Sequence, residues 1–530
     1  MAWPSNKSCA EPRALKSFAR NHRPVRVADL VAERRTAGAR SCIATRGIWG
    51  ALARVHFRVM WVPVSAQVYP ENLARKRTAI TTLPCLLALV LTASCTPKTS
   101  EINEPVVAPK AFSATGSGKM SERFWQAFAD EKLDALVQSA LASNLDLKSS
   151  YYRIVEFRAM ARKEGAAKIP TLSATVGAQL RHPVPFQNDY LRLGLETSYE
   201  VDLWGRIASA QKAAVFRAQA SEADWQALRI SLAAEVCSTW YQIVEARAQE
   251  LLLRQQLQTN EALLTMVQSL YDGGQASSVD ELRQTQVVSD SKTRTLAVEV
   301  EIATLRNRLD QLLGNVPHTL KAQGAGPLPS IPGLPETGIP ADLIKRRPDV
   351  QSAYLLLQAS DRDLASAISN RYPRLSLSAQ IGTRGGSGVT LFRDWFATLA
   401  ANLIAPIIDG GLRRAEVDRV RAITKQRLFA YGQASLVAIR EVEDALIREA
   451  NQAERIRFLE EQVALAKQSY AQLEVEYLNG IATYTDLLTT LSTEQELQRS
   501  LLQAQRVAIE FRIALYRALA GGFESEKERQ

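Results

Sequence analysis

The sequence predicts a mainly α-helical protein with a β-barrel part, built from two copies of one unit. Three observations predict this fold. The 67 residues from Arg206 to Asp272 contain neither glycine nor proline, and such a run would make one helix of about 100 Å. Two stretches that alternate between apolar and polar residues precede it, as barrel strands do. Both features recur about 205 residues later, which indicates an internal duplication.

The net charge of +10 comes from the first 94 residues of the chain. They contain 15 of the 65 lysines and arginines but only 4 of the 55 aspartates and glutamates. The remaining residues hold 50 basic and 51 acidic side chains, and therefore have no basic excess to pair with phosphate groups. We expect no nucleic-acid partner.

A lipoprotein signal is predicted in residues 60–94. Arg75, Lys76 and Arg77 precede a short apolar run that ends in small residues, which is typical of secretory signals. The run is too short for a comfortable transmembrane helix. Residues 91–95, Leu-Thr-Ala-Ser-Cys, resemble a bacterial lipoprotein signal, and the resemblance makes Cys95 the lipidated N-terminus. A plain secretory signal with an incidental cysteine is the alternative. Residues 1–59 are interpreted as a spurious or disordered extension.

The first repeat is predicted over residues 121–316, after a lipidated tether at 95–120. Helical periodicity covers 121 to about 168, and two strands of about ten residues follow. The first strand alternates from Leu172 to Leu180, and the second alternates from Leu191 to Asp202. A sheet of a soluble protein with one solvent-exposed face would give the same alternating pattern. The long helix then reaches a reversal at Gly273 and Gly274, and a return helix ends near Leu313.

The second repeat is predicted over residues 341–522, between a linker at 317–340 and a tail at 523–530. It contains a helix at about 348–370, two strands at about 375–381 and 395–403, and a second helical hairpin from 407 to about 520. Its landmarks follow those of the first repeat at nearly constant offsets, which are 203 residues from Pro170 to Pro373 and 206 from Gly274 to Gly480.

Four strands per chain cannot close a transmembrane barrel, because open strand edges are not tolerated in lipid. Barrels of this kind need at least eight strands. Two copies of the chain would supply eight strands and three copies would supply twelve. The helical hairpins would then form a ring of antiparallel helices below the barrel.

Four short sequence motifs give the chain a resemblance to a known family. They are residues 199–206 (YEVDLWGR), 346–350 (RRPDV), 406–411 (PIIDGG) and 440–445 (REVEDA). The sequence resembles the outer-membrane efflux channels of the TolC type, and within them the NodT-like lipoproteins, over about 120–522. The resemblance implies a homotrimer with a twelve-stranded outer-membrane barrel and a periplasmic α-helical tunnel. It further implies a periplasmic membrane-fusion adaptor and an inner-membrane pump of the resistance-nodulation-division class as partners, and passive export of drugs or other small molecules.

The tips of the two hairpins are the candidate functional site. Each tip has a tyrosine, a glycine three residues later and an aspartate six residues after that: Tyr271, Gly274 and Asp280, then Tyr477, Gly480 and Asp486. The resemblance implies that these tips close the periplasmic entrance and contact the adaptor. It also matches Asp486 to the family's gate aspartate, which would form a ring of three carboxylates in a trimer. The alternative is an aspartate that N-caps the return helix, and the two roles are compatible.

The tips also depart from the family pattern. Thr489 stands where a second gate aspartate is expected, and Ala482 where an arginine is expected. The charged latch that the resemblance implies is therefore reduced at these tips.

Catalysis is poorly supported, and we expect no enzyme activity and no cofactor or metal. Outside the leader the histidines are His182 and His318, far apart and beside prolines, and no phosphate-binding or metalloprotease motif is present. Two alternatives to an efflux duct remain. One is the outer-membrane part of a type I protein secretion system, and the other is a periplasmic coiled-coil scaffold without a pore.

Overall fold

The computed structural model describes residues 105–118, 123–179, 190–319 and 326–521. The predicted lipoprotein signal, Cys95 and His182 lie outside the described residues. Within them the chain is mostly helical, with one sheet of four strands. None of the described helices is both long and apolar enough to cross a membrane.

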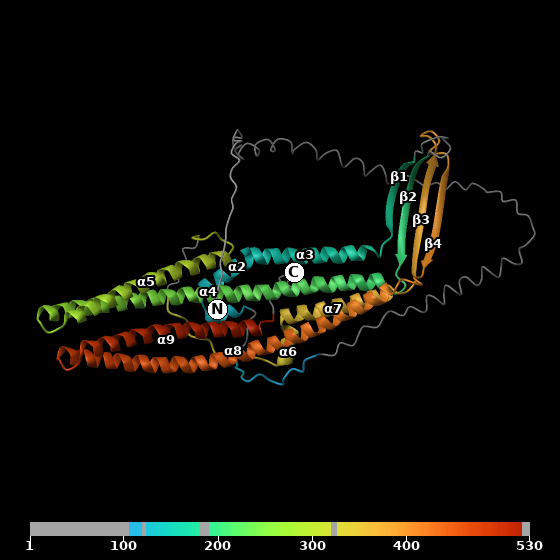
Figure 1. The fold of residues 1–530 in the computed structure, drawn as a ribbon. Helices are drawn as coiled ribbons and strands as arrows, with labels where there is room; N and C mark the ends of the chain where they lie inside the picture. The colour runs from blue at the N-terminus through green and yellow to red at the C-terminus, as the bar shows by residue number, and fades with distance from the viewer. Residues whose placement is uncertain (1–104, 119–122, 180–189, 320–325, 522–530) are drawn as a thin grey trace, which may run out of the picture. The chain divides into compact units, whose positions relative to one another are not determined.

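Apart from one short 3-10 helix, the elements occur twice in the same order, which confirms the predicted duplicated fold (Figure 1). The first set consists of a 3-10 helix η2 (Phe124–Phe128), α2 (Glu131–Ser143), α3 (Leu145–Ala166), β1 (Thr171–Gln179), β2 (Tyr190–Val201), α4 (Arg206–Asp272) and α5 (Ser278–Leu312). The second set consists of α6 (Pro340–Arg346), α7 (Pro348–Ser369), β3 (Arg374–Gly385), β4 (Trp395–Ile404), α8 (Leu412–Leu478) and α9 (Tyr484–Leu519).

The junction between β2 and α4 is fixed by the first of the four motifs, residues 199–206. Gly205 has a φ of 71° and allows the chain to turn from strand to helix. The carboxylate of Asp202 accepts hydrogen bonds from the first backbone N–H groups of α4, at 3.1 Å from Ile207 and 2.7 Å from Ala208. The Trp204 indole donates to the carbonyl oxygen of Pro373 at 2.7 Å, and so ties this junction to the one before β3.

The four strands form an antiparallel sheet in the order β1-β2-β3-β4. Directly paired residues share a face of the sheet. The row Leu172, Thr197, Ala379 and Leu399 and the row Ala174, Leu195, Ile381 and Ala397 therefore belong to one apolar face. The row Ser173, Glu196, Gln380 and Thr398 belongs to the opposite, polar face. β1 and β4 each have a single neighbouring strand, so the sheet has two open edges.

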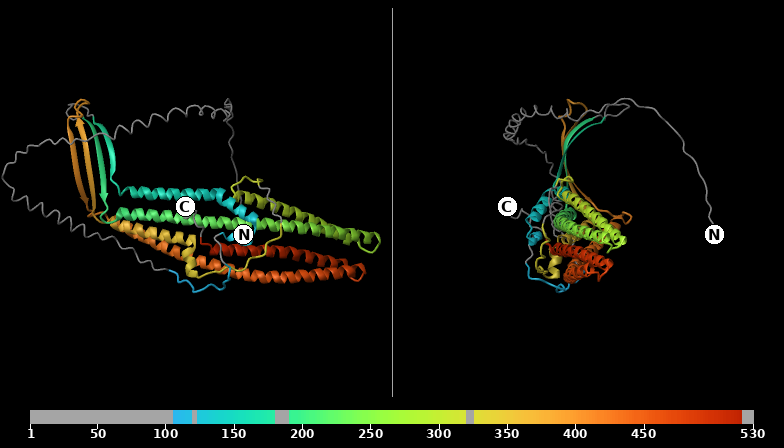
Figure 2. Two further views of the ribbon diagram at one scale, coloured as in Figure 1. Left: turned by 180° about the vertical axis from the view of Figure 1, so that it is seen from behind. Right: turned by 90° about the vertical axis from the view of Figure 1, so that its left-hand side faces the viewer.

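Each long helix changes partners along its length (Figure 2). Near the sheet, α4 packs against α3 and α7, and further away it packs against α5 and α9. α8 packs first against α7 and then against α9. The four helices of the distal half therefore lie in the order α5, α4, α9, α8, in which α5 and α8 are the outer members.

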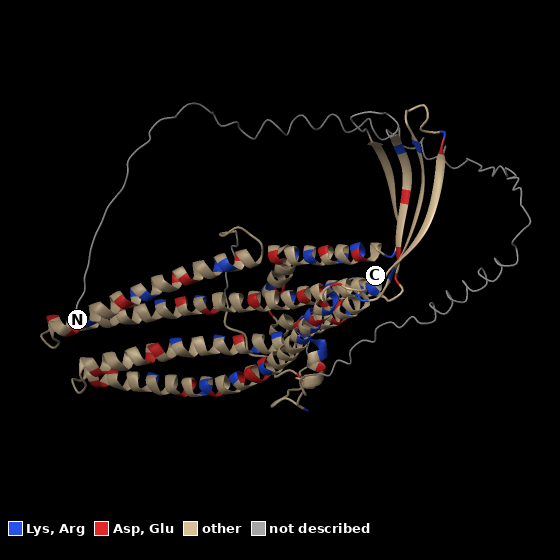
Figure 3. Ribbon diagram, turned by 45° about the vertical axis from the view of Figure 1, so that its right-hand side comes forward, with Lys and Arg blue, Asp and Glu red and all other residues tan. Residues whose placement is uncertain are grey.

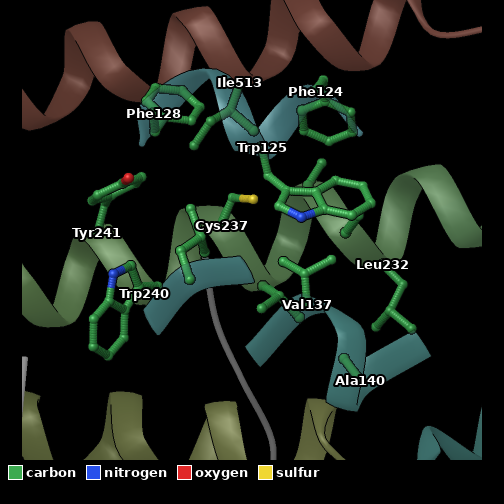
Figure 4. Close-up of a cluster of buried hydrophobic side chains, with 14 of the residues drawn as sticks. Phe124, Trp125, Phe128, Val137, Ala140, Leu232, Cys237, Trp240, Tyr241 and Ile513 are labelled. Carbon is green, nitrogen blue, oxygen red and sulfur yellow. The ribbon is translucent and has the colours of Figure 1, made fainter. Parts of the chain in front are cut away.

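The largest core lies at about the middle of α4, where η2 and α2 pack against it (Figure 4). The Trp125 indole donates to Asp134 at 2.7 Å, and the Trp240 indole donates to Asp130 at 2.8 Å. The hydrogen bond from Trp125 lowers the pKa of Asp134 below its usual range, against the opposing effect of burial. Cys237, which belongs to the same core, is fully buried, and burial raises the pKa of its thiol.

The motifs at residues 346–350 and 440–445 connect α7 to α8. The guanidinium of Arg347 is bonded at 2.7 Å to Asp349 and at 2.8 Å to Glu441, and it also donates to the carbonyl oxygen of Ala518. Pro348 occupies the first turn of α7, where its missing N–H has no cost. Arg347 therefore connects the start of α7 with α8 and with the end of α9.

Three regions differ from the sequence prediction. The continuous helix predicted from 121 to 168 is split into η2, α2 and α3, because Asp130 and Asn144 cap new helix starts. The linker predicted to reach 340 already contains the start of α6, with Pro340 in its first turn. The tether predicted at 95–120 is packed against the body from Pro105 to Gly118. There Ser113 N–H donates to Glu443 at 3.0 Å and Gly118 pairs with Pro335.

Gly432 in α8 allows this packed segment to approach. A Cβ atom at Gly432 would lie 2.8 Å from the Cγ atom of Pro105, which is closer than packed atoms allow. We expect Gly432→Ala to detach the segment and increase its cleavage in limited proteolysis. The melting temperature should not fall in parallel, because alanine favours the helix by about 1 kcal/mol. Gln433→Ala, at the neighbouring exposed position, is the control, and equal cleavage of both variants would contradict the packing role.

Candidate functional site at the hairpin tips

The first tip joins α4 to α5 in a compact turn. Gly274 has a φ of 72°, a conformation that glycine adopts without strain. The N–H groups of Gln275 and Ala276 both donate to the carbonyl oxygen of Leu270, at 2.8 and 3.2 Å. The exposed side chain of Tyr271 precedes this turn. The tip is therefore closed by backbone hydrogen bonds, as at many glycine-terminated helices.

The second tip repeats this turn between α8 and α9. Gly480 has a φ of 73°, and the N–H groups of Ile481 and Ala482 donate to the carbonyl oxygen of Glu476, at 2.9 and 3.3 Å. Each bond corresponds to one at the first tip after a shift of 206 residues. The duplication thus extends to individual hydrogen bonds.

The two aspartates of the tips have the same local role. Ser277 is the N-cap of α5, and its hydroxyl accepts from the N–H of Asp280, whose carboxylate accepts from the N–H of Ser277 at 3.2 Å. Thr483 and Asp486 form the same capping box at the start of α9, with the return bond at 3.3 Å. The alternative role, in which the aspartate itself N-caps the helix, is therefore wrong in detail. Thr483 is the cap, and Asp486 supports it from the third position of the helix.

Tyr477 and Tyr484 break the symmetry between the tips. Tyr477 is half-buried, unlike exposed Tyr271, and its ring lies 6.3 Å from that of Tyr484. Tyr484 is buried at 4% exposure, and the corresponding residue of the first repeat is Ser278. Both rings belong to a small apolar cluster with Leu263, Val267, Leu487 and Leu491.

Tyr484 connects the two hairpins. Its hydroxyl donates to Oε1 of Gln284 in α5 at 2.7 Å, and Nε2 of Gln284 donates to the carbonyl oxygen of Asn260 in α4 at 2.7 Å. Gln284 is completely buried. Burial, with a contribution from the charge of Asp280, raises the pKa of Tyr484, so the phenol stays protonated and remains a donor. This connection was missed by the sequence interpretation.

An exposed contact lies beside the buried one. The guanidinium of Arg283 donates to the hydroxyl of Thr485 at 3.1 Å, and so also joins α5 to α9. Thr489 and Ala482, where charged residues were expected, make no hydrogen bond between the hairpins among the described residues. The tip therefore has a different set of connecting residues from the one that the resemblance suggested.

A seam of polar side chains continues upward between α4 and α9. Asn260 and Gln495 are bonded at 3.1 Å, Gln256 accepts from Arg499 at 2.6 Å, and Gln242 donates to Glu510 at 2.8 Å. Water can replace such contacts at low net cost. The seam is therefore a weaker connection than an apolar coiled-coil interface of the same length.

A groove of about 580 Å³ lies along this seam, with walls from α5 and α9 and a floor from α4. Glu245 is largely buried at its floor and lies 3.8 Å from Arg506. Burial raises the pKa of Glu245, and the hydrogen bond from Gln249 and the charge of Arg506 oppose this rise. The charged lining consists of Glu245, Glu301, Glu496, Arg294, Arg499 and Arg506, which balances the two signs.

Comparison with known proteins gives consistent matches along both repeats. The family model described as outer membrane efflux protein matches residues 136–315 and 339–521. The chain is 28% identical to the pyoverdine export outer membrane protein OpmQ of Pseudomonas aeruginosa, over 84% of this chain and 98% of that protein. It is also 28% identical to the toluene efflux pump outer membrane protein TtgI of Pseudomonas putida, over 75% of this chain and 86% of that protein.

Solved structures agree with the fold. The outer-membrane channel OprN superimposes with a TM-score of 0.75 at 26% identity, over 81% of this chain and 99% of that one. CusC superimposes with a TM-score of 0.72 at 22% identity, over 80% of this chain and 99% of that one. The two matched segments of the family model correspond to the two sets of elements described above.

Proposed function

The chain belongs to the outer membrane efflux protein family, and we propose that three copies of it form the exit duct of a tripartite efflux pump. The observation that carries this proposal is the sheet with one apolar face and two open edges. In lipid such edges must be paired. If β1 of one copy pairs with β4 of the next, three copies close a barrel of twelve strands with its apolar face toward the lipid.

The outer helices support the same assembly. Exposed apolar side chains follow one face of α8: Phe429, Leu436, Ile447, Phe458 and Leu465. α5, at the other end of the row of helices, exposes Leu282, Leu296 and Val300. Stripes of this kind are covered in stable proteins. We propose that α8 of one copy packs against α5 of the next, which continues the ring of helices around the duct.

The tips are proposed as the periplasmic entrance and the site of adaptor contact. Tyr484, Gln284 and Asn260 would form the latch that keeps the two hairpins of one chain together, with Arg283 and Thr485 beside it. Opening would separate the hairpins at this contact, and the polar seam above it would lose bonds that water can replace. An inner-membrane pump of the resistance-nodulation-division class, joined through a membrane-fusion adaptor, would supply the energy.

The cargo is proposed to be drugs or other small molecules, which rests on the family and on relatives named for export of pyoverdine and toluene. We also propose that Cys95 carries the lipid anchor. Metabolic labelling with palmitate should label the wild-type chain, and Cys95→Ser should lose the label. Labelling that survives the substitution would contradict this position.

The proposed duct can be tested by conductance measurements. The purified protein should run as a heat-modifiable trimer and should produce discrete conductance steps in planar lipid bilayers. A protein that forms trimers without conductance would instead be a scaffold without a pore.

Asp486→Ala tests the gate aspartate. In the proposed trimer three copies of Asp486 would attract cations to the entrance, so we expect the variant to lose part of its cation selectivity and of its block by Mg²⁺. Thr483→Ala is the matched control, because it breaks the same capping box, worth about 1 kcal/mol, and keeps the carboxylate of Asp486. Equal effects of the two variants on selectivity would show that Asp486 is only a capping residue.

A further inference from the structure

A pair of arginines lies on the polar face of the sheet, at the end remote from the helices. Arg192 in β2 is directly paired with Arg384 in β3. Both lie close to the loop ends of their strands, since β2 begins at Tyr190 and β3 ends at Gly385. Figure 3 shows blue on several strands at this end of the sheet, with one red segment at the start of β4, and further red closer to the helices. In an outer-membrane duct this end of the barrel is the exit.

Neither arginine has an acidic partner in the described part of the chain. No salt bridge of Arg192 or Arg384 occurs there, and Nε of Arg192 is buried without a hydrogen bond. Asp394 immediately precedes β4, where the register continues to the position opposite Arg384, but within the described residues it forms no salt bridge with either arginine. Other arginines of the fold, such as Arg347 and Arg512, are paired with carboxylates.

Within the paired strands, the nearest acid on the same face is too far away to neutralise the pair. Glu196 is four residues further along β2, which corresponds to about 13 Å. The intervening row of the polar face holds Gly194, Gly382 and Phe396 and contributes no charge. The described charged residues at this end comprise Arg192, Arg384 and Arg393 against the single acid Asp394, so their net charge is positive.

The direct pairing of Arg192 with Arg384 lowers the stability of the sheet, which suggests that the pair has a function. Like charges directly opposite each other destabilise a pair of strands, and departures from local consistency concentrate at functional sites. The ring of Tyr190 lies 5.3 Å from the guanidinium of Arg384, and such stacking orients the group. An oriented guanidinium binds carboxylates and phosphates through two parallel hydrogen bonds.

We propose that Arg192 and Arg384 form an anion-binding collar at the exit of the duct, which favours solutes that carry carboxylate or phosphate groups. The proposal rests on the proposed trimer, in which the polar face lines the lumen and three pairs would surround the pore. Rings of arginine in pores attract anions. The collar would hold anionic cargo in the last part of its path, at the opposite end from Asp486.

The test is the double variant Arg192→Gln/Arg384→Gln in planar bilayers. In a KCl gradient the ratio of chloride to potassium permeability should fall by about two- to threefold relative to wild type. Inorganic phosphate, added on the barrel side, should reduce the single-channel current of the wild type and have less effect on the variant. Arg192→Lys/Arg384→Lys is the matched control, because it keeps the charge, and it should retain the wild-type permeability ratio.

The outcomes separate the two proposals. Absence of conductance in the wild type would overturn the duct itself. Normal conductance steps with an unchanged permeability ratio in the glutamine variant would overturn the collar and leave the duct intact. A lysine variant that loses anion preference as fully as the glutamine variant would overturn the assignment to charge.

Discussion

Replacement of Leu399 by arginine is expected to abolish assembly of the duct. Leu399 lies near the middle of β4 and is 83% exposed in the single chain. It belongs to the apolar face of the sheet, where its row contains Leu172, Thr197 and Ala379. An arginine on the lipid face near the bilayer midplane costs about 2–4 kcal/mol, and a trimer contains three copies. We expect the heat-modifiable trimer to disappear from gels of outer-membrane fractions.

Thr398→Arg is the matched control. Thr398 adjoins Leu399 in the chain but belongs to the polar face, in the row of Glu196 and Gln380. An arginine there would point into the lumen, so the trimer should persist. If both variants assemble equally well, the apolar face does not contact lipid, and the barrel proposal fails.

Tyr484→Phe is expected to weaken the closed state of the entrance. The change keeps the buried ring and its packing in the tip cluster, but leaves Oε1 of Gln284 without its donor in a fully buried position. An unsatisfied buried acceptor costs about 1–3 kcal/mol. If opening exposes Gln284 to water, that cost falls on the closed state alone. The open fraction should then rise by about tenfold for 1.4 kcal/mol, measured as larger and more frequent conductance steps.

Tyr271→Phe controls for the removal of a hydroxyl group at a tip. Tyr271 is 44% exposed, and its hydroxyl makes no hydrogen bond within the described residues. Its conductance should equal that of the wild type. A Tyr484→Phe channel that also behaves like the wild type would show that the contact between Tyr484 and Gln284 does not hold the entrance shut.

The bounds of the long helices could be predicted from the sequence because they depend on neighbouring residues. α4 begins and ends at Arg206 and Asp272 as predicted, since Gly205 and Gly273 interrupt the pattern on either side. Strand faces were also predictable, because alternation has a period of two. The capping boxes could also have been predicted from the sequence, because Thr483 and Asp486 have the spacing of such a motif.

Contacts between the repeats could not be predicted in this way. The bond between Tyr484 and Gln284 joins residues 200 positions apart and exists only because α9 packs beside α4 and its first residue reaches α5. The packed segment from Pro105 to Gly118 was missed for a related reason. Its composition is typical of a flexible linker, but a second extended segment around Pro335 supplies the hydrogen bonds that its own sequence does not.

The two open edges of the sheet have a genetic consequence. In the proposed trimer, β1 and β4 of each chain pair with other copies, so one defective subunit would affect its healthy neighbours. In cells that make equal amounts of the wild-type chain and an assembly-competent but blocked variant, only about one trimer in eight would lack the variant. Alleles of this kind should therefore act as dominant negatives.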